Sequence, residues 1–137
     1  MKEDGKDVGH IQDWMFAVQH LISAEHHLIE SYAITNQKIF LEANEKIRKK
    51  RSKLMFEVVP KKEGQIYCIT KHLLGASQGL KELANRLVEE GNLELSKEYF
   101  KDSQEFEAIV MILNDFDVKK KSFINIVKDK LKVVENV

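Results

Sequence analysis

The chain has 137 residues, of which 43% are hydrophobic and 32% are charged, a balance typical of one soluble globular domain rather than a disordered chain. No apolar core follows the charged start of the chain, and the longest strongly apolar run, Ala108 to Leu113, is six residues. Both features argue against a signal peptide and a membrane span. The single cysteine, Cys68, excludes an internal disulfide, so we expect a cytoplasmic protein without membrane contact.

Helical periodicity runs through nearly the whole chain. The first predicted helix covers residues 8–34, with Asp7 as its N-cap. Thr35 and Asn36 form a turn and a new cap before a second helix over 37–58. Pro60 then ends this helix, because a proline disfavours helical geometry in the residue before it.

The third predicted helix carries the clearest apolar stripe of the chain, at alternating spacings of three and four residues. The stripe consists of Ile66, Ile69, Leu73, Ala76, Leu80, Leu83 and Leu87. Gly91 is a natural C′ residue and Asn92 a natural N-cap, so we expect a sharp turn and a fourth helix to about residue 116. A last amphipathic segment contains Phe123, Ile124, Val127, Leu131 and Val134.

Short connections favour antiparallel neighbours. The sequence therefore predicts an all-α fold, an up-down antiparallel four-helix bundle with an additional C-terminal helix, in one domain over residues 1–137.

Two acidic residues, Glu25 and Asp102, stand in stripes that are otherwise apolar. With successive residues about 100° apart around a helix, each falls at or near the centre of its stripe. The stripe around Glu25 is Ile11, Trp14, Val18, Leu21, Ile22, Leu28, Ile29 and Tyr32, and that around Asp102 is Leu95, Tyr99, Phe106, Ile109, Leu113 and Phe116. A carboxylate that faces a core must be paired, protonated or bound to a cation, because leaving it bare costs several kcal/mol.

In an up-down bundle both acids lie at one level, roughly 14 Å from the same end, on neighbouring helices. Lys50 or Arg51 of the second helix faces inward nearby, so one interpretation is a half-buried ion pair that fixes helix register. The alternative is a small-ligand or divalent-metal site, with Glu25 and Asp102 as ligands and His26 as a third. No glutamate stands three residues before a histidine, as ferritin-like di-iron sites require, so we expect no cofactor, with a divalent metal as the alternative.

Gly75 and Gly79 lie inside the third predicted helix, where each glycine costs about 1 kcal/mol relative to alanine. Close approach of another helix, from the same chain or from a second copy, would compensate this cost. Both glycines are therefore candidate interface residues.

The charges are segregated although the net charge is zero. Residues 38–62 carry nine Lys/Arg against three Asp/Glu, residues 82–117 carry three against ten, and residues 118–137 carry six against two. Such blocks favour electrostatic complementarity within the chain or between copies. The densest basic run, over 46–53, also allows a nucleic-acid-binding module, although the acidic block would repel phosphate and the aromatic interleaving of single-strand binders is missing.

No phosphate-binding loop, zinc-protease helix, paired cysteine motif or nucleophile elbow is present, and we assign no catalytic residues. The sequence thus favours a non-enzymatic protein-interaction or assembly module that self-associates or binds a protein partner. A metal- or small-ligand-binding protein and a nucleic-acid-binding module are the alternatives.

Overall fold

The computed structural model of the chain describes residues 8–59 and 65–114, and these form four α-helices. The helices are α1 (Val8–Thr35), α2 (Lys38–Phe56), α3 (Ile66–Glu89) and α4 (Leu93–Leu113). Their ends agree with the predicted ones to within three residues. None of these helices is long and apolar enough to cross a membrane. The predicted N-cap Asp7, the terminator Pro60 and the C-terminal helix lie outside the described residues.

The turn between α1 and α2 uses both residues that the sequence assigns to it. Asn36 adopts a left-handed φ of 59°, which asparagine tolerates better than most residues, and its N–H donates to the Tyr32 carbonyl. Thr35 Oγ1 accepts a hydrogen bond from the Gln37 N–H at 3.2 Å. The prediction that this turn caps α2 is wrong in one respect, because the N-cap is Gln37 and its side chain makes no capping hydrogen bond.

The turn between α3 and α4 confirms the predicted Gly-Asn signal. Gly91 has a φ of 84°, a conformation that favours glycine. Asn92 Oδ1 accepts a hydrogen bond from the Leu95 N–H at 3.3 Å, so Asn92 is the N-cap of α4. The two residues reverse the chain and make α3 and α4 antiparallel.

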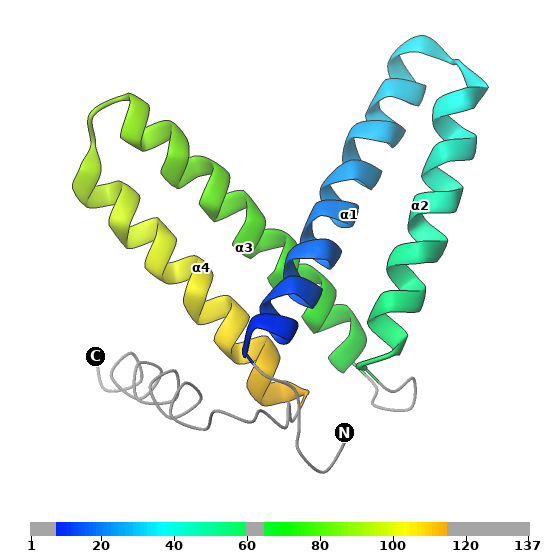
Figure 1. The fold of residues 1–137 in the computed structure, drawn as a ribbon. Helices are drawn as coiled ribbons and strands as arrows, with labels where there is room; N and C mark the ends of the chain where they lie inside the picture. The colour runs from blue at the N-terminus through cyan, green and yellow to red at the C-terminus, as the bar shows by residue number, and fades with distance from the viewer. Residues whose placement is uncertain (1–7, 60–64, 115–137) are drawn as a thin grey trace.

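The four helices form two antiparallel hairpins, α1–α2 and α3–α4, that diverge like the arms of a V (Figure 1). The hairpins meet at the base of the V, where α1 begins, α2 ends, α3 begins and α4 ends. α1 packs against α2 along its length and against α3 near the base. The tips of the two hairpins therefore point away from each other.

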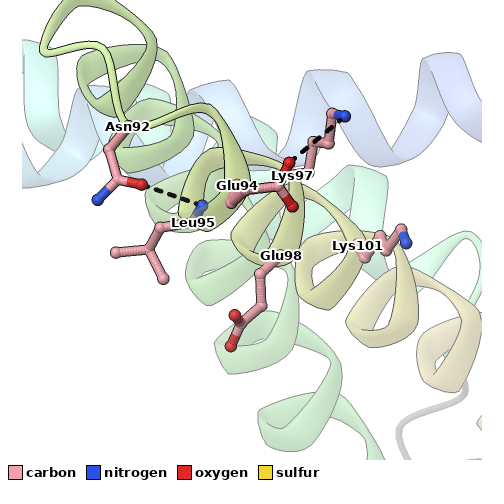
Figure 2. Close-up of a pocket in the computed structure, with 6 residues that line it drawn as sticks. All are labelled: Asn92, Glu94, Leu95, Lys97, Glu98 and Lys101. Atoms are coloured by element: carbon pink, nitrogen blue, oxygen red, sulfur yellow. Dashed lines mark hydrogen bonds and ion pairs between the residues drawn. The ribbon is translucent and has the colours of Figure 1, made fainter.

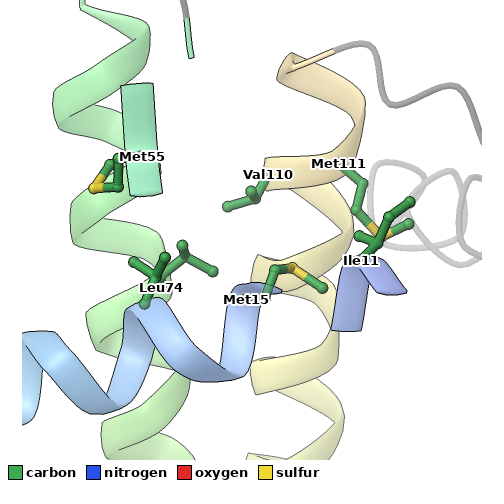
Figure 3. Close-up of a cluster of buried hydrophobic side chains, with 7 residues drawn as sticks. Ile11, Met15, Met55, Leu74, Val110 and Met111 are labelled. Atoms are coloured by element: carbon green, nitrogen blue, oxygen red, sulfur yellow. The ribbon is translucent and has the colours of Figure 1, made fainter. Parts of the chain in front are cut away.

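The hydrophobic core of the described residues lies at this base. It joins side chains from all four helices: Ile11, Met15, Val18, Met55, Leu74, Val110 and Met111 (Figure 3). Each is at most 3% exposed. Three of the seven are methionines, whose unbranched side chains fill irregular gaps between helices that cross at an angle.

The α3–α4 hairpin packs through small side chains at heptad spacing. These are Thr70, Ser77 and Ala84 on α3, and Ser96, Ser103 and Val110 on α4, all at most 7% exposed. The hydroxyls bond to the opposite backbone: Ser96 Oγ donates to the Ala84 carbonyl at 2.8 Å, and Ser77 Oγ lies 3.1 Å from the Ser103 carbonyl oxygen. These small side chains and their hydrogen bonds to the backbone allow the two helices to approach closely.

Candidate interaction surface

Many of the apolar side chains of α3 and α4 are only partly buried, although Leu73 packs against the core at the base. We call the surface formed by the others the outer face, and it consists of Ile69, Ala76, Leu80, Leu83 and Leu87 of α3 with Leu95, Tyr99, Phe106, Ile109 and Leu113 of α4. None of these residues is buried, and Leu83 is 41% exposed. The predicted α3 stripe is thus buried only in part: Leu73 packs against the core, whereas Ile69, Ala76 and Leu83 are exposed.

Apart from Leu73, which packs against the core, both stripes lie on the side of the hairpin away from α1. On α3, Gly75 meets Ile22 of α1, whereas the stripe is turned roughly 130° around the helix from Gly75. On α4, Glu107 accepts a hydrogen bond from Gln19 of α1. Around the α4 helix, the residues that face α3 lie between Glu107 and the α4 stripe. The two stripes thus form one half-exposed apolar surface, of the kind that marks interaction sites in soluble proteins.

Asp102 lies within the α4 part of the outer face, half-buried among the apolar side chains. Glu98 and Glu105 stand four residues before it and three after it, so the three carboxylates share one side of α4. None of them forms a hydrogen bond or ion pair with another described residue. Like charges at this spacing repel one another, and the outer face therefore carries an acidic edge that no cation of residues 8–59 and 65–114 pairs with.

Glu25 is paired within its own hairpin. Arg51 Nε donates to Glu25 Oε2 at 2.8 Å and Nη2 donates to Oε1 at 2.9 Å, so the guanidinium engages both carboxylate oxygens. Arg51 is only 3% exposed. The guanidinium of Arg51 also contacts α3, because its Nη1 donates to the Tyr67 hydroxyl at 2.9 Å. One buried cation thereby fixes α1, α2 and α3 at the base of the V.

The Arg51 guanidinium keeps its charge despite burial. Its hydrogen bond to Glu25 raises the pKa of Arg51 above its usual value and outweighs the opposing effect of burial. Tyr67 is held in turn by stacking against Phe56, with ring centroids 4.5 Å apart. The ion pair is therefore a structural tie at the base of the V.

Glu25 and Asp102 lie on different arms of the V, contrary to the prediction that they face each other at one level. α1 and α4 touch at Gln19 and Glu107, near the base. Glu25 lies six residues beyond Gln19 and Asp102 lies five residues beyond Glu107, each toward a diverging tip (Figure 1). The prediction fails because it assumes parallel packing of the two hairpins along their full length.

The other candidate ligand residues lie apart from this ion pair. Lys50 and His26 are exposed, and His26 has an edge-to-face ring contact with His27. Among residues 8–59 and 65–114, no three or more His, Cys, Asp or Glu side chains are grouped so as to hold a metal ion. The basic run on α2 is exposed at Lys46, Arg48, Lys49, Lys50 and Lys53, and nucleic-acid binding through it stays a prediction.

The two candidate interface glycines have different surroundings. A Cβ atom at Gly75 would meet Ile22 Cγ2 at 3.5 Å, so this glycine allows α1 to approach α3. A Cβ atom at Gly79 would meet nothing within 4 Å, and Gly79 lies on the exposed side of α3 beside the outer face. Its role in an interface stays a prediction.

We expect opposite effects from substituting the two glycines. Gly79→Ala should raise the free energy of unfolding by about 0.5–1 kcal/mol, because alanine forms helix better and the site is open. Gly75→Leu should lower it by about 1–3 kcal/mol, because the added atoms run into Ile22. Urea unfolding of both variants checks this, and a stabilised Gly75→Leu would contradict the packing of α1 on α3.

A second polar cluster, which the sequence analysis missed, lies where α1 crosses the α3–α4 hairpin. Glu107 Oε2 accepts hydrogen bonds from Gln19 Nε2 at 2.8 Å, Ser77 Oγ at 2.9 Å and Lys81 Nζ at 2.5 Å. Gln19 is 1% exposed, and its Oε1 has no hydrogen-bond partner among the described residues. Ser77 belongs to the heptad of small residues, which is the sequence signal that could have located this cluster.

The hollows of the described surface include one beside the Glu107 cluster and one at the start of α4. One of about 250 Å³ borders the Glu107 cluster between Phe16 of α1 and Phe100 of α4. The other, of about 520 Å³, is lined by Asn92 and the first turns of α4 alone, so no second helix faces it (Figure 2). Figure 2 shows the Glu98 carboxylate directed away from Lys97 and Lys101, which leaves its charge on the acidic edge unneutralised by these lysines.

Comparisons of the chain with protein-family models, with curated proteins and with solved structures find no match.

Proposed function

We propose that this protein is a non-enzymatic interaction module and that the outer face of the α3–α4 hairpin is its docking surface for a basic amphipathic helix. The observation that carries the proposal is the position of the strongest apolar stripe of the chain, which lies half-exposed on the outside of the hairpin. A helical partner would remove this apolar surface from water, at roughly 25 cal/mol for each Å² buried.

The shape of the surface favours a helix as the occupant. Two antiparallel helices present parallel rows of side chains, and an amphipathic helix can pack its own apolar row against such rows. The outer face follows both helices from the tip, at Leu87 and Leu95, to the base, at Ile69 and Leu113. A row of this length suits several turns of a partner helix.

The charge of the surface favours a basic occupant. Glu98, Asp102 and Glu105 flank the apolar row on α4 without cationic partners among the described residues. A partner with lysine or arginine beside its apolar stripe would neutralise this edge, whereas an acidic partner would add to the repulsion. Asp102 thus supports specificity in a surface whose affinity comes from apolar contact.

The test is a fluorescence-anisotropy titration of the full chain with two labelled peptides. One is a synthetic helix of leucine and lysine at heptad spacing, and the other carries glutamate at every lysine position. We expect the basic peptide to bind and the acidic one to bind at least about tenfold more weakly, a difference of about 1.4 kcal/mol. Equal affinity for the two peptides, or no binding of either, would contradict the proposal.

Matched variants locate the binding on the outer face. Leu83→Gln should weaken the basic peptide about tenfold, and Asp102→Asn should reduce the preference for the basic over the acidic peptide. The control is Ile34→Gln, which changes a 75% exposed side chain on the other hairpin and should leave both affinities unchanged. Equal losses in Leu83→Gln and Ile34→Gln would place the binding elsewhere.

Self-association is the form of this function that the sequence favours. Residues 38–62 carry a net charge of +6, and α2 exposes Ile39 to 62% beside its lysines. The α2 helix of a second copy thus offers the chemistry that the outer face would bind. Native mass spectrometry of the full chain distinguishes self-association from binding of another protein. Oligomers that Leu83→Gln disrupts would show that copies of the chain assemble through the outer face. A monomer would show that the partner of the outer face is a different protein.

A further inference from the structure

We propose that α2 carries a second binding surface, a row of lysines that binds the phosphate backbone of double-stranded nucleic acid without reading its sequence. We call this row the lysine stripe, and it consists of Lys46, Lys49, Lys50 and Lys53. The stripe belongs to the α1–α2 hairpin, whereas the outer face belongs to the α3–α4 hairpin. The inference therefore goes beyond the proposed function and does not depend on it.

The spacing of these lysines places them on one side of α2. Counted from Lys46, the other three follow after three, four and seven residues, and residues at these spacings are neighbours on a helix surface. With about 100° between successive residues, the stripe covers an arc of roughly 100° and rises about 10 Å along the helix. Arg51 and Met55, the buried residues of α2, lie on the opposite side. The stripe therefore points away from α1, and all of its lysines are exposed.

The lysines of the stripe have no anionic partners among residues 8–59 and 65–114. The ion pairs within these ranges join other residues. Glu42 and Glu45 stand four residues before Lys46 and Lys49, and exposed pairs of this kind contribute little even when they form. Like charges that are three or four residues apart on a helix repel one another, so an anion bound along the stripe would relieve this repulsion.

The V shape keeps the acidic edge of α4 away from the lysine stripe. Figure 1 shows α2 and α4 on opposite sides of the V, with α1 and α3 between them. A helix with its side chains is about 10 Å thick, and the Debye length in physiological salt is about 8 Å. The acidic block on α4 therefore has little effect on an anion bound at α2, although the sequence alone indicated repulsion.

A duplex fits the stripe better than a single strand or a membrane does. Single-strand binders stack bases on aromatic side chains, and residues 46–53 contain none. A helix that enters a membrane surface needs an exposed apolar face, whereas Leu54 and Met55 on the apolar side of α2 pack in the core at the base. A DNA duplex carries one negative charge for about every 1.7 Å of its axis, so it offers several phosphates over the length of the stripe.

The first test is a fluorescence-anisotropy titration of a short labelled DNA duplex with the full chain, at salt concentrations between about 50 and 200 mM. We expect the affinity to fall by about 40- to 150-fold over this range, because three or four phosphate contacts release about as many counterions. A duplex of different sequence should bind equally, because phosphate contacts carry no sequence information. An RNA duplex, titrated alongside, distinguishes the two kinds of nucleic acid. No binding of either kind in about 50 mM salt, or a strong preference for one sequence, would overturn the inference.

Two variants with the same loss of charge locate the binding on the stripe. Lys50→Gln removes one of its lysines, and should weaken both DNA duplexes about tenfold and reduce the slope of log affinity against log salt by about one. Arg48→Gln removes an exposed cation roughly opposite the stripe and should change the affinity by less than about twofold. Equal losses in the two variants would show attraction to the overall charge of α2 and would contradict a role for the stripe.

Two further measurements distinguish the other anionic occupants. Vesicles of equal parts phosphatidylserine and phosphatidylcholine that bind more tightly than the duplex, at equal phosphate concentration, would assign the stripe to a membrane surface and overturn the inference. Oligomers in native mass spectrometry that Lys50→Gln disrupts, without duplex binding, would assign the stripe to the acidic edge of a second copy, with the same consequence. Leu83→Gln alters only the outer face and should leave the duplex affinity unchanged, whether or not the outer face binds a helix.

Discussion

Glu25→Gln should lower the free energy of unfolding by about 3 kcal/mol, because it leaves the guanidinium of Arg51 buried without a counter-charge. Arg51 is 3% exposed, and only neutral groups would remain beside it: the glutamine amide oxygen, the Tyr67 hydroxyl and the Met55 sulfur. Urea unfolding followed by circular dichroism measures the loss directly. The ion pair connects three helices at the base, so we expect one cooperative transition shifted to lower urea.

The control for this prediction removes both charges. The double variant Glu25→Leu with Arg51→Met should unfold within about 1 kcal/mol of the wild type or be more stable, because apolar side chains of similar volume can replace a buried ion pair without loss. A loss below about 1 kcal/mol in Glu25→Gln would show that water reaches Arg51 and that the pair is not a structural tie. The same variants test the metal hypothesis, since a Glu25 metal site predicts lost metal uptake in Glu25→Gln.

Glu107→Leu should cost about 2–4 kcal/mol of stability, because one carboxylate oxygen accepts hydrogen bonds from three donors on two other helices. Gln19 on α1 and Ser77 and Lys81 on α3 all bond to Glu107 Oε2. Without this acceptor, neither Nε2 nor Oε1 of the buried Gln19 side chain has a hydrogen-bond partner among the described residues. Each buried polar group without a hydrogen bond costs about 1–3 kcal/mol.

The matched control for the Glu107 cluster is on the same helix. Glu105 is half-buried and forms no hydrogen bond or ion pair with another described residue, so Glu105→Leu should change stability by at most about 0.5 kcal/mol. Thermal and urea unfolding of the two variants compare them side by side. Equal effects would mean that the crossing of α1 over the α3–α4 hairpin is held by apolar contact alone.

The sequence predicts the all-α fold and the positions of the four helices because local signals determine both. Gly91 and Asn92 show this most clearly: one takes a left-handed φ and the other caps α4, as their chemistry dictates. The antiparallel pairing within each hairpin follows from the short turns. These inferences need no knowledge of contacts between distant residues.

The arrangement of the hairpins could not be predicted from the apolar stripes, because a stripe shows what a helix can bury and not what it does bury. On α3 the small residues Thr70, Ser77 and Ala84 are buried, whereas Leu80 is only partly buried and Leu83 is exposed. The signal for this contact was the recurrence of small residues every seven positions on both helices. Large apolar side chains dominate the hydrophobic pattern of a sequence, although small side chains allow two helices to approach most closely.

Glu25 and Asp102, the two acidic residues in apolar stripes, differ in how well the sequence predicted their surroundings. Arg51 lies within reach of Glu25 because α1 and α2 form a local hairpin, and the sequence already indicated Arg51 as a partner. Asp102 was assigned to the same core only because a closed bundle was assumed. In the divergent arrangement it lies in the outer face, where its carboxylate is the feature that favours a basic occupant.

The measurement that tests the docking surface most directly is NMR chemical-shift mapping of the ¹⁵N-labelled full chain as the basic peptide of leucine and lysine is added. We predict that the shifted amides gather on the outer face, around Leu80, Leu83 and Asp102, and that those of α2 stay in place. Shifts centred on α1 and α2, or shifts that the acidic peptide reproduces equally, would contradict the account.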